Sequence, residues 1–307
     1  MFRISHCSPR EVDNKISCYN KSFLIKIANI LNESPECDKI DINLEKKELY
    51  DKISKEISKI SHCKDELCWL TEFDRIKNLL SKDEEKLFLD SFKPIMPNSW
   101  LKEKNKWLTT NDINNVMYQY QKKYKDFKFM GSNPIDFDLE EKGVCLTGGN
   151  LCNIDINELL NESKTKIGMV FNTDPSTKEG QHWFSVYVDL KGINRKKVPC
   201  IYYFDSAKKI TKKNIEKVIP KEIQDLVLDL QNQKKIIDQK KSDKEKIELE
   251  FLFNNQKHQH QDTECGVYCL HFLTEMLKGK DFIKYINAKN NDKKMERFRK
   301  KFFIERK

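Results

Sequence analysis

Two kinds of segment are missing from this chain, and each absence excludes a class of protein. No charged start is followed by an apolar run, and no hydrophobic stretch is long enough to cross a bilayer. Secretion and membrane insertion are therefore not expected. We predict an intracellular, soluble protein with no membrane partner.

The cysteines lack the paired CxxC spacing of zinc-binding domains, although the chain has ten of them. Because they are scattered and no secretion signal precedes them, we expect most of them to be reduced thiols. The best local metal candidate is the group His62, Cys63 and Cys68, but two cysteines and one histidine make a poor structural zinc site. We predict neither a bound metal nor a cofactor.

Clustered aromatic residues are missing from the basic stretches. The formal net charge is +9, because 57 basic residues outnumber 48 acidic ones. The basic residues are interleaved with acids, unlike those of a groove for single-stranded nucleic acid, and they support at most a weak, salt-sensitive contact with nucleic acid. The residues concerned are Lys208, Lys209, Lys212, Lys213, Lys234, Lys235, Lys240 and Lys241.

Residues 1–98 are predicted to form a separate helical domain. Three apolar stripes at helical spacing indicate three helices, each with one buried face. Pro94 and Pro97 lie in the segment 93–98, which is typical of a linker. The stripes consist of Phe23, Leu24, Ile27, Ile30 and Leu31, then Ile53, Ile57 and Ile60, then Phe73, Ile76, Leu79 and Leu80.

Residues 99–307 are predicted to form an α+β domain, with a mixed central sheet flanked by helices. Thr110 or Asn111 can cap its first helix. Apolar patterning indicates strands at 144–146, 167–171, 184–190, 201–204 and 250–253. Further helices are indicated over 220–246, from residue 265 onward, and in the tail around Met295.

A cysteine at the start of a predicted helix is the first candidate for chemistry. Free N–H groups and the helix dipole favour a thiolate at Cys265, and the same N–H groups can receive a developing oxyanion. Gly266 would let a substrate backbone approach closely. Gln259 could donate its side-chain amide to the oxyanion, and the nearby Gln261 is the alternative donor.

A histidine and an aspartate lie at the ends of two predicted strands. His182 precedes the run 184–190, where apolar and polar residues alternate as in a half-buried strand, and Asp205 ends the next run. If the two strands are adjacent, Asp205 reaches the far nitrogen of His182, fixes its tautomer and stabilises the imidazolium. With Cys265, these residues form the catalytic set of a cysteine-nucleophile hydrolase.

Each of these residues also has a purely structural explanation. A cysteine before a helix is usually a small buried residue, and an aspartate after a strand is usually part of a turn. Only the order of the residues along the chain, with Trp183 directly after His182 and Gln259 ahead of Cys265, favours catalysis.

Three segments of the chain resemble the catalytic motifs of the SUMO-protease-like cysteine peptidases. They read GQHWF at 180–184, YFDS at 203–206 and QHQDTECG at 259–266. The resemblance is closest to the polyprotein-processing protease of African swine fever virus and its relatives in other large DNA viruses. NTD at 172–174 and WLT at 107–109 extend it over residues 100–305.

The resemblance implies a SUMO-protease/adenovirus-protease-like core and a role for each motif residue. It assigns the roles of nucleophile, general base, orienter and oxyanion donor, in that order, to Cys265, His182, Asp205 and Gln259. Trp183 would cover the catalytic cleft. Asn172 matches a position close to the active site and is expected, with Gly266, on the substrate side.

The resemblance also implies an activity, namely a cysteine endopeptidase that cleaves after Gly-Gly in viral structural polyproteins during maturation of the virion core. Glycine would fit under a covering tryptophan where other side chains would clash. Such an enzyme is expected at viral assembly sites in the host cytoplasm and in the virion. The alternatives are a protease that removes SUMO or ubiquitin-like tags, and a catalytically inactive, DNA-associated scaffold. The chain's own Gly148-Gly149-Asn150 is read as a hairpin turn rather than a self-processing site.

Overall fold

The computed structural model describes residues 6–10, 16–71, 73–147, 151–239 and 248–305. The chain divides into two compact units, Met1–Met96 with Lys301–Lys307, and Pro97–Lys300. The boundary expected from the sequence falls two residues later, after residue 98, and leaves the tail in the second domain. Residues 301–307 belong to the first unit because Ile304 joins its apolar core and forms a parallel β-bridge with Ile95.

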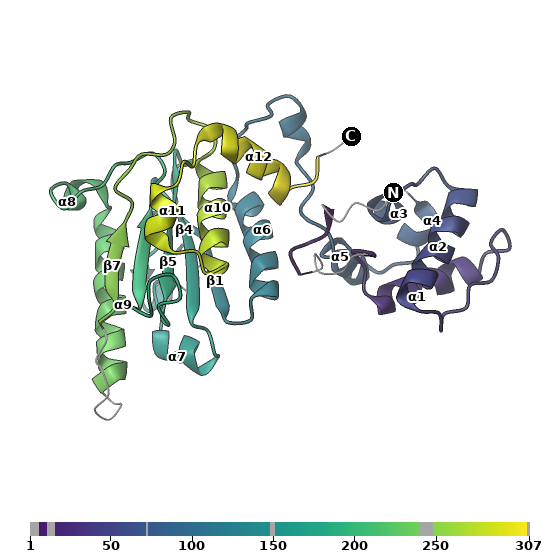
Figure 1. Ribbon diagram of the computed structural model, residues 1–307, viewed down its shortest axis with the longest axis horizontal. Helices are drawn as coiled ribbons and strands as arrows, with labels where there is room; N and C mark the ends of the chain where they lie inside the picture. Colours follow the sequence, from purple (N-terminus) through teal and green to yellow (C-terminus); the bar gives the residue numbers. More distant parts are fainter. Residues whose placement is uncertain (1–5, 11–15, 72, 148–150, 240–247, 306–307) are drawn as a thin grey trace. The chain divides into compact units, whose positions relative to one another are not determined.

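The first unit consists of short helices, α1 (Lys21–Asn32), α2 (Lys46–Ile60), α3 (Glu66–Thr71), α4 (Asp74–Lys77) and α5 (Lys82–Leu89), shown in Figure 1. The first two predicted stripes are confirmed, since their central residues are buried in α1 and α2. The third prediction is wrong in extent. α4 ends at Lys77, and Leu79, which lies beyond its end, is 54% exposed. Ser81 and Glu84 then form the capping box of α5.

The expectation of mostly reduced cysteines is wrong. Disulfides join Cys7 to Cys18, Cys63 to Cys68, and Cys145 to Cys152, while Cys37, Cys200, Cys265 and Cys269 are free. The bonded partners are only 5 to 11 residues apart, so local turns bring them together, and a CxxC search does not detect such spacings. His62 lies beside the Cys63–Cys68 pair, with all three ligand atoms within 4.8 Å of one another, but the disulfide occupies both sulfurs.

The second unit contains a five-stranded sheet in the order β1-β4-β5-β6-β7. The strands are β1 (Phe127–Asn133), β4 (Lys166–Asn172), β5 (Trp183–Asp189), β6 (Cys200–Phe204) and β7 (Glu250–Phe253). The outer pairs β1–β4 and β6–β7 are parallel and the inner pairs are antiparallel, so the predicted mixed sheet is confirmed. The sequence analysis missed β1, because Gly131, Ser132 and Asn133 make its second half look like a turn.

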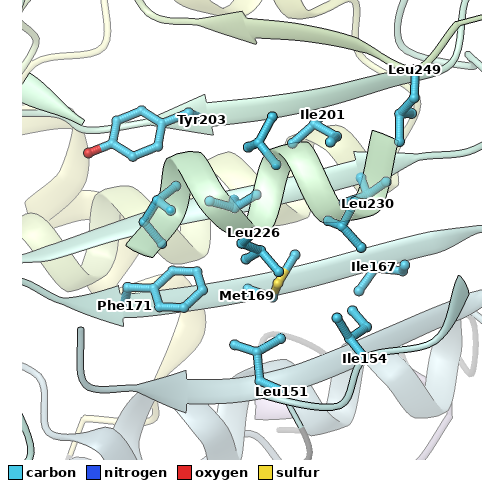
Figure 2. Packing of buried hydrophobic residues seen from close by; sticks show 14 of the residues in the cluster. Leu151, Ile154, Ile167, Met169, Phe171, Ile201, Tyr203, Leu226, Leu230 and Leu249 are labelled. Atoms are coloured by element: carbon cyan, nitrogen blue, oxygen red, sulfur yellow. The ribbon is translucent and has the colours of Figure 1, made fainter. Parts of the chain in front are cut away.

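Helices cover both faces of this sheet. Figure 2 shows one face, where Leu226 and Leu230 of α9 (Lys221–Gln239) pack on Met169 and Ile201 of the strands. α7 (Ile156–Asn161) adds to this core, while α6 (Thr110–Lys123) and α10 (Cys265–Leu277) contact the strands from the other side. All seven residues of β5 are therefore buried, and the half-buried strand expected from its alternation is wrong. Its alternate polar residues, Ser185, Tyr187 and Asp189, are all shielded from solvent.

The remaining elements lie at the margins of the sheet. The strand predicted at 144–146 is β3 (Val144–Cys145), which pairs with β2 (Glu140–Glu141) in a separate two-stranded sheet. Gly148-Gly149-Asn150 lies outside the described residues. The second unit also contains α8 (Ile215–Val218), α11 (Phe282–Asn287) and α12 (Asp292–Phe302), whose last two residues belong to the first unit.

Helix starts are set by side-chain caps near the expected positions. α6 is capped by Thr109, one residue before the predicted cap, and Asp112 completes the capping box. Among the described residues, no helix combines the length and apolarity required to span a membrane.

Candidate active site

The ends of three strands and the start of one helix meet at one edge of the sheet. β5 begins at Trp183 and its antiparallel neighbour β6 ends at Phe204, so His182 and Asp205 leave the sheet on the same side. β7 runs parallel to β6 and ends at that edge too. The segment 254–264 then leads to Cys265, the first residue of α10.

His182 and Asp205 are in direct contact, as the strand ends predict. Nε2 of His182 lies 2.8 Å from Oδ1 of Asp205, and that oxygen also accepts a hydrogen bond of 2.9 Å from the backbone N–H of Ala207. Asp205 is 2% exposed. Because Nε2 is held by the carboxylate, Nδ1 is the nitrogen left for Cys265, whose side chain also hydrogen-bonds the imidazole.

The electrostatics of this site favour a charged imidazole. Burial alone would lower the pKa of His182, but hydrogen bonds and charge interactions with Asp205 and Cys265 outweigh it and raise the pKa to about 10. At neutral pH the histidine is therefore an imidazolium. A positively charged imidazole is the partner that activates a cysteine nucleophile.

Cys265 has free backbone donors beside it. It is the first residue of α10 and is 1% exposed. The residue at the N-cap position, Glu264, makes no side-chain capping bond, so its carboxylate does not occupy the N–H groups of the first turn. Those groups can receive an oxyanion that forms at the attacking sulfur.

Gln259 is the better placed of the two candidate amides. It is 4% exposed, and its Oε1 accepts a hydrogen bond of 2.7 Å from the hydroxyl of Ser206, which orients the amide nitrogen. That nitrogen makes one bond of 2.6 Å to the carbonyl of Gln261 and keeps a second hydrogen for another acceptor. The side chain of Gln261 is exposed and lacks such an anchor among the described contacts. The geometry favours Gln259 as the donor.

Asn172 shapes the loop before His182. Its Oδ1 accepts hydrogen bonds from the backbone N–H groups of Asp174, at 3.0 Å, and Gln181, at 3.2 Å. A Cβ on Gly180 would come within 2.4 Å of the Asn172 amide, so only glycine fits there, at a φ of +87°. Asn172 thus braces the loop, and its expected place on the substrate side stays a prediction.

The covering role expected for Trp183 stays a prediction, and the structure shows what its indole contacts. Trp183 is 8% exposed, and its indole N–H donates a hydrogen bond of 2.9 Å to the carbonyl of Leu108. Leu108 also fills the space beside Gly266, where an added Cβ would lie 2.9 Å from the Leu108 Cβ. Gly266 therefore admits the Leu108 side chain, whereas the sequence analysis reserved this space for substrate.

The tryptophan that lines the open pocket is Trp107. A pocket of about 580 Å³ is bounded by Trp107, His182, Gln259 and Gln261, and Trp183 is not among its lining residues. Trp107 is 39% exposed and also borders a second pocket of about 570 Å³ with Thr263. Its indole thus lies between two openings, one of which contains the catalytic histidine.

Two further residues of the site were missed in the sequence. Asn254, directly after β7, is fully buried; its Oδ1 accepts from the Asp205 N–H and its amide donates to the Asp205 carbonyl, both at 2.9 Å. Ser206 anchors Gln259 as described above. The available signal for Asn254 was that a polar residue directly follows β7. That signal becomes informative only when β7 is known to lie beside β6, which ends directly before Asp205.

Comparisons with known proteins agree with this geometry. Residues 140–305, more than half of the chain, match the family described as YopJ Serine/Threonine acetyltransferase. A thiol protease of Acanthamoeba polyphaga mimivirus is 29% identical over 291 residues, which cover 90% of this chain and 85% of that protein. The SUMO-1 cysteine protease of African swine fever virus is 29% identical over 138 residues, 44% of this chain and 43% of the relative.

The fold has a solved counterpart. The crystal structure of the African swine fever virus protease matches with a TM-score of 0.65 at 19% identity, covering 99% of this chain and 97% of the other. The predicted α+β class and the recognition of a SUMO-protease-like core are confirmed. The catalytic roles of Cys265, His182, Asp205 and Gln259 stay predictions that the geometry makes chemically consistent.

Proposed function

Because this chain belongs to the family described as YopJ Serine/Threonine acetyltransferase and is a viral cysteine protease of the SUMO-protease-like kind, we propose that it cleaves viral structural polyproteins after Gly-Gly. The observation that carries this proposal is the contact of His182 with both Asp205 and Cys265 beside an open pocket.

The first half of the proposed reaction forms an acyl-enzyme. The Cys265 thiolate attacks the carbonyl carbon of the second glycine, and the carbonyl oxygen becomes an oxyanion. Gln259 and the first N–H groups of α10 donate hydrogen bonds to that oxygen. His182 then gives its Nδ1 proton to the leaving amine as the C–N bond breaks. A thioester remains on Cys265.

The second half returns the enzyme to its starting state. Neutral His182 accepts a proton from a water molecule, which attacks the thioester carbon. The second oxyanion collapses, and the C–S bond breaks to release the new carboxyl terminus and the thiolate. Asp205 holds the imidazole throughout and stabilises it whenever it is charged.

The glycine preference rests on the position of Trp107. Its indole borders the pocket that contains His182 and Gln259, so a substrate strand bound in this pocket would lie against the ring. Residues without a Cβ pass an indole most closely. We therefore assign a covering role to Trp107, in addition to the one expected for Trp183, for the same reason of Gly-Gly specificity.

The proposed partner is a viral core polyprotein, and the proposed locations are the assembly sites in the host cytoplasm and the virion. These follow from the activity, because a maturation protease has to meet its substrate where particles assemble. The two pocket lysines, Lys208 and Lys257, would favour an acidic segment near the cut.

The test is cleavage of a peptide with a Gly-Gly-Xaa junction, followed by intact-mass detection of both products. Wild type should cut after the second glycine, and Cys265→Ala should lose at least about 10⁴-fold in kcat. The matched control is Cys200→Ala, because Cys200 is also a free, buried cysteine of the second unit. Equal cleavage by wild type and Cys265→Ala would refute the proposal.

An electrophilic probe with a ubiquitin-like C-terminus distinguishes a polyprotein-processing protease from a deconjugating protease. If wild type labels with this probe and leaves the polyprotein peptide intact, the enzyme is a deconjugating protease. If neither substrate reacts and Cys265 alkylates no faster than Cys200, the protein is an inactive scaffold.

Acetyl transfer is a second candidate, favoured by the description of the matching family. A thioester on Cys265 can pass its acyl group to a serine or threonine hydroxyl instead of water. Incubation with radiolabelled acetyl-CoA and a viral core protein tests it. Label on the core protein that Cys265→Ala abolishes, without peptide cleavage by wild type, would select transfer over hydrolysis.

A further inference from the structure

A buried ion pair lies directly beside the nucleophile. Glu264, the residue before Cys265, has no exposed surface, and Arg299 of α12 is 3% exposed. The Nε atom of Arg299 lies 3.2 and 3.1 Å from the two carboxylate oxygens, and Nη2 lies 3.1 Å from Oε2. Burial raises the pKa of Glu264, while the charge and hydrogen bonds of Arg299 act to lower it.

The same guanidinium holds a second segment of the site. Its Nη1 donates a hydrogen bond of 2.8 Å to the carbonyl of Lys106, and its carbon lies 4.6 Å from the ring centroid of Trp100. Two residues after Lys106, Leu108 accepts the Trp183 indole and fills the space beside Gly266. Arg299 therefore joins the residue before the nucleophile to the segment that carries Trp107.

A second side chain of α12 holds the loop of the oxyanion donor. Oδ2 of Asp292 accepts hydrogen bonds from the backbone N–H groups of His260, at 3.0 Å, and Gln261, at 3.2 Å. Its Oδ1 accepts one of 3.1 Å from the hydroxyl of Tyr268, in α10. Those N–H groups belong to the two residues that follow Gln259.

The spacing on the helix explains how one element performs both tasks. Asp292 and Arg299 are seven residues apart, which places them on one face of α12, two turns from each other. Met295, between them on that face, is fully buried. α12, labelled in Figure 1, thus contacts the segment 260–264 at two points, just before the nucleophile.

We propose that α12 is a catalytic brace in which Arg299 positions Cys265 and the Trp107 segment while Asp292 positions Gln259. Neither side chain reaches the reacting atoms, so both are positioning residues. Arg299 also has an electrostatic task. The buried carboxylate of Glu264 belongs to the residue directly before Cys265, so an uncompensated charge there would oppose a thiolate, and the guanidinium of Arg299 compensates it. The kinetic part of this inference rests on the proposed peptidase activity, whereas the alkylation part needs no substrate.

The test compares Arg299→Met with Arg297→Met in the full chain, because Arg297 is an exposed arginine of the same helix. Three quantities are measured: the rate of Cys265 alkylation by iodoacetamide across pH, kcat and KM on a Gly-Gly-Xaa peptide, and the folded fraction at the assay temperature. Arg299→Met should slow alkylation about tenfold, because Glu264 loses its counter-charge, and lower kcat about a hundredfold, because the site is displaced. Arg297→Met should match wild type.

The double variant Glu264→Gln/Arg299→Met separates the two tasks of the arginine. It removes both charges, so alkylation should return to within about threefold of wild type, while kcat stays at least about tenfold low because the bond to Lys106 is still missing. Asp292→Asn should leave alkylation unchanged and lower kcat alone. If both parameters recover in the double variant, the positional task is refuted.

Loss of folding has its own control. If Arg299→Met unfolds, Arg299→Lys takes its place, because it keeps the charge near Glu264 and loses the planar guanidinium that also reaches Lys106. It should alkylate like wild type and lose about tenfold in kcat. Wild-type kcat in Arg299→Lys, or rates in Arg299→Met that equal those of Arg297→Met per folded molecule, would overturn the proposal. If the wild type cuts no peptide, but Arg299→Met still alkylates more slowly than wild type and Arg297→Met, the result would count against the peptidase activity and for the brace.

Discussion

Three buried carboxylates, two in the second unit and one in the first, show what the partner of a buried charge decides, although Glu56 of the first unit pairs with Lys59. In the second unit, Asp205 is paired with the imidazole of His182 and Glu264 with the guanidinium of Arg299. In the first unit, the buried Glu66 has neutral partners, namely the Ser17 hydroxyl and the Cys18 N–H. Burial raises the pKa of Glu66 to about 7. A cationic partner offsets part of the cost of burying a carboxylate, whereas a carboxylate with neutral partners is a cost to folding near neutral pH.

The units also differ in how their chains are tied together. The first unit joins short helices through local turns and carries two of the disulfides, Cys7–Cys18 and Cys63–Cys68. The second unit depends on strand pairs between distant segments, such as β1 with β4 and β6 with β7. We therefore expect substitutions at the sheet edge to affect rate and substitutions in the first unit to affect stability.

The largest expected effect is that of Asp205→Asn. Loss of the carboxylate removes the strongest cause of the raised His182 pKa, so the imidazolium is lost at lower pH. We expect kcat/KM to fall about a thousandfold, and the alkaline limb of its pH profile to move down from near pH 10. Full pH–rate profiles measure this. Asp225→Asn, an exposed aspartate on α9, is the control, and an unmoved alkaline limb would contradict the assignment.

Gln259→Ala ranks second. Loss of one oxyanion donor should lower kcat by about a hundredfold with little change in KM, because the bond forms mainly in the transition state. Gln261→Ala should stay within about threefold of wild type, since its side chain is exposed and carries no such role. Steady-state kinetics on the same peptide compare the two variants. A larger loss of kcat in Gln261→Ala than in Gln259→Ala would make Gln261 the oxyanion donor instead.

Cys7→Ser/Cys18→Ser should affect stability alone. The disulfide closes a loop with a sequence separation of 11, so its loss should cost the first unit about 3 kcal/mol in free energy of unfolding. Denaturant titration with tyrosine and tryptophan fluorescence measures this, and kcat/KM on the short peptide should not change. Cys37→Ser is the matched control, because Cys37 is a free cysteine of the same unit. A parallel loss of activity would show that the separation of tasks between the units is wrong.

The smallest effect is expected for Glu66→Gln, and it depends on pH. The pKa of Glu66 in the folded state, about 7, lies above the ordinary 4.5, so its contribution to stability is complete below pH 4.5 and is lost as pH rises through 7. The glutamine variant should therefore gain stability relative to wild type at pH 8, by about 1–2 kcal/mol, and much less at pH 5. Thermal unfolding at both pH values tests this sign. An equal gain at both pH values would show that the ionisation of Glu66 does not affect stability.

Local sequence patterns predicted much of the fold. The stripes in α1 and α2, the strands β4 to β7 and the start of α10 at Cys265 all match periodicities that a short window contains. The failures have non-local causes. Burial on both faces of β5 depends on helices from 265–277 and 221–239, and the disulfides depend on which turns bring sulfurs together.

The candidate site shows the same division. The sequence by itself determined the residue types of the catalytic set and their place at strand ends and a helix start, because peptide geometry fixes such positions over a few residues. Only the tertiary structure decided that Trp107 rather than Trp183 lines the pocket, that Asn254 supports Asp205, and that Arg299 pairs with Glu264. The contacts of Asn254 with Asp205 and of Arg299 with Glu264 join residues 49 and 35 positions apart, where no local pattern carries information about the partner.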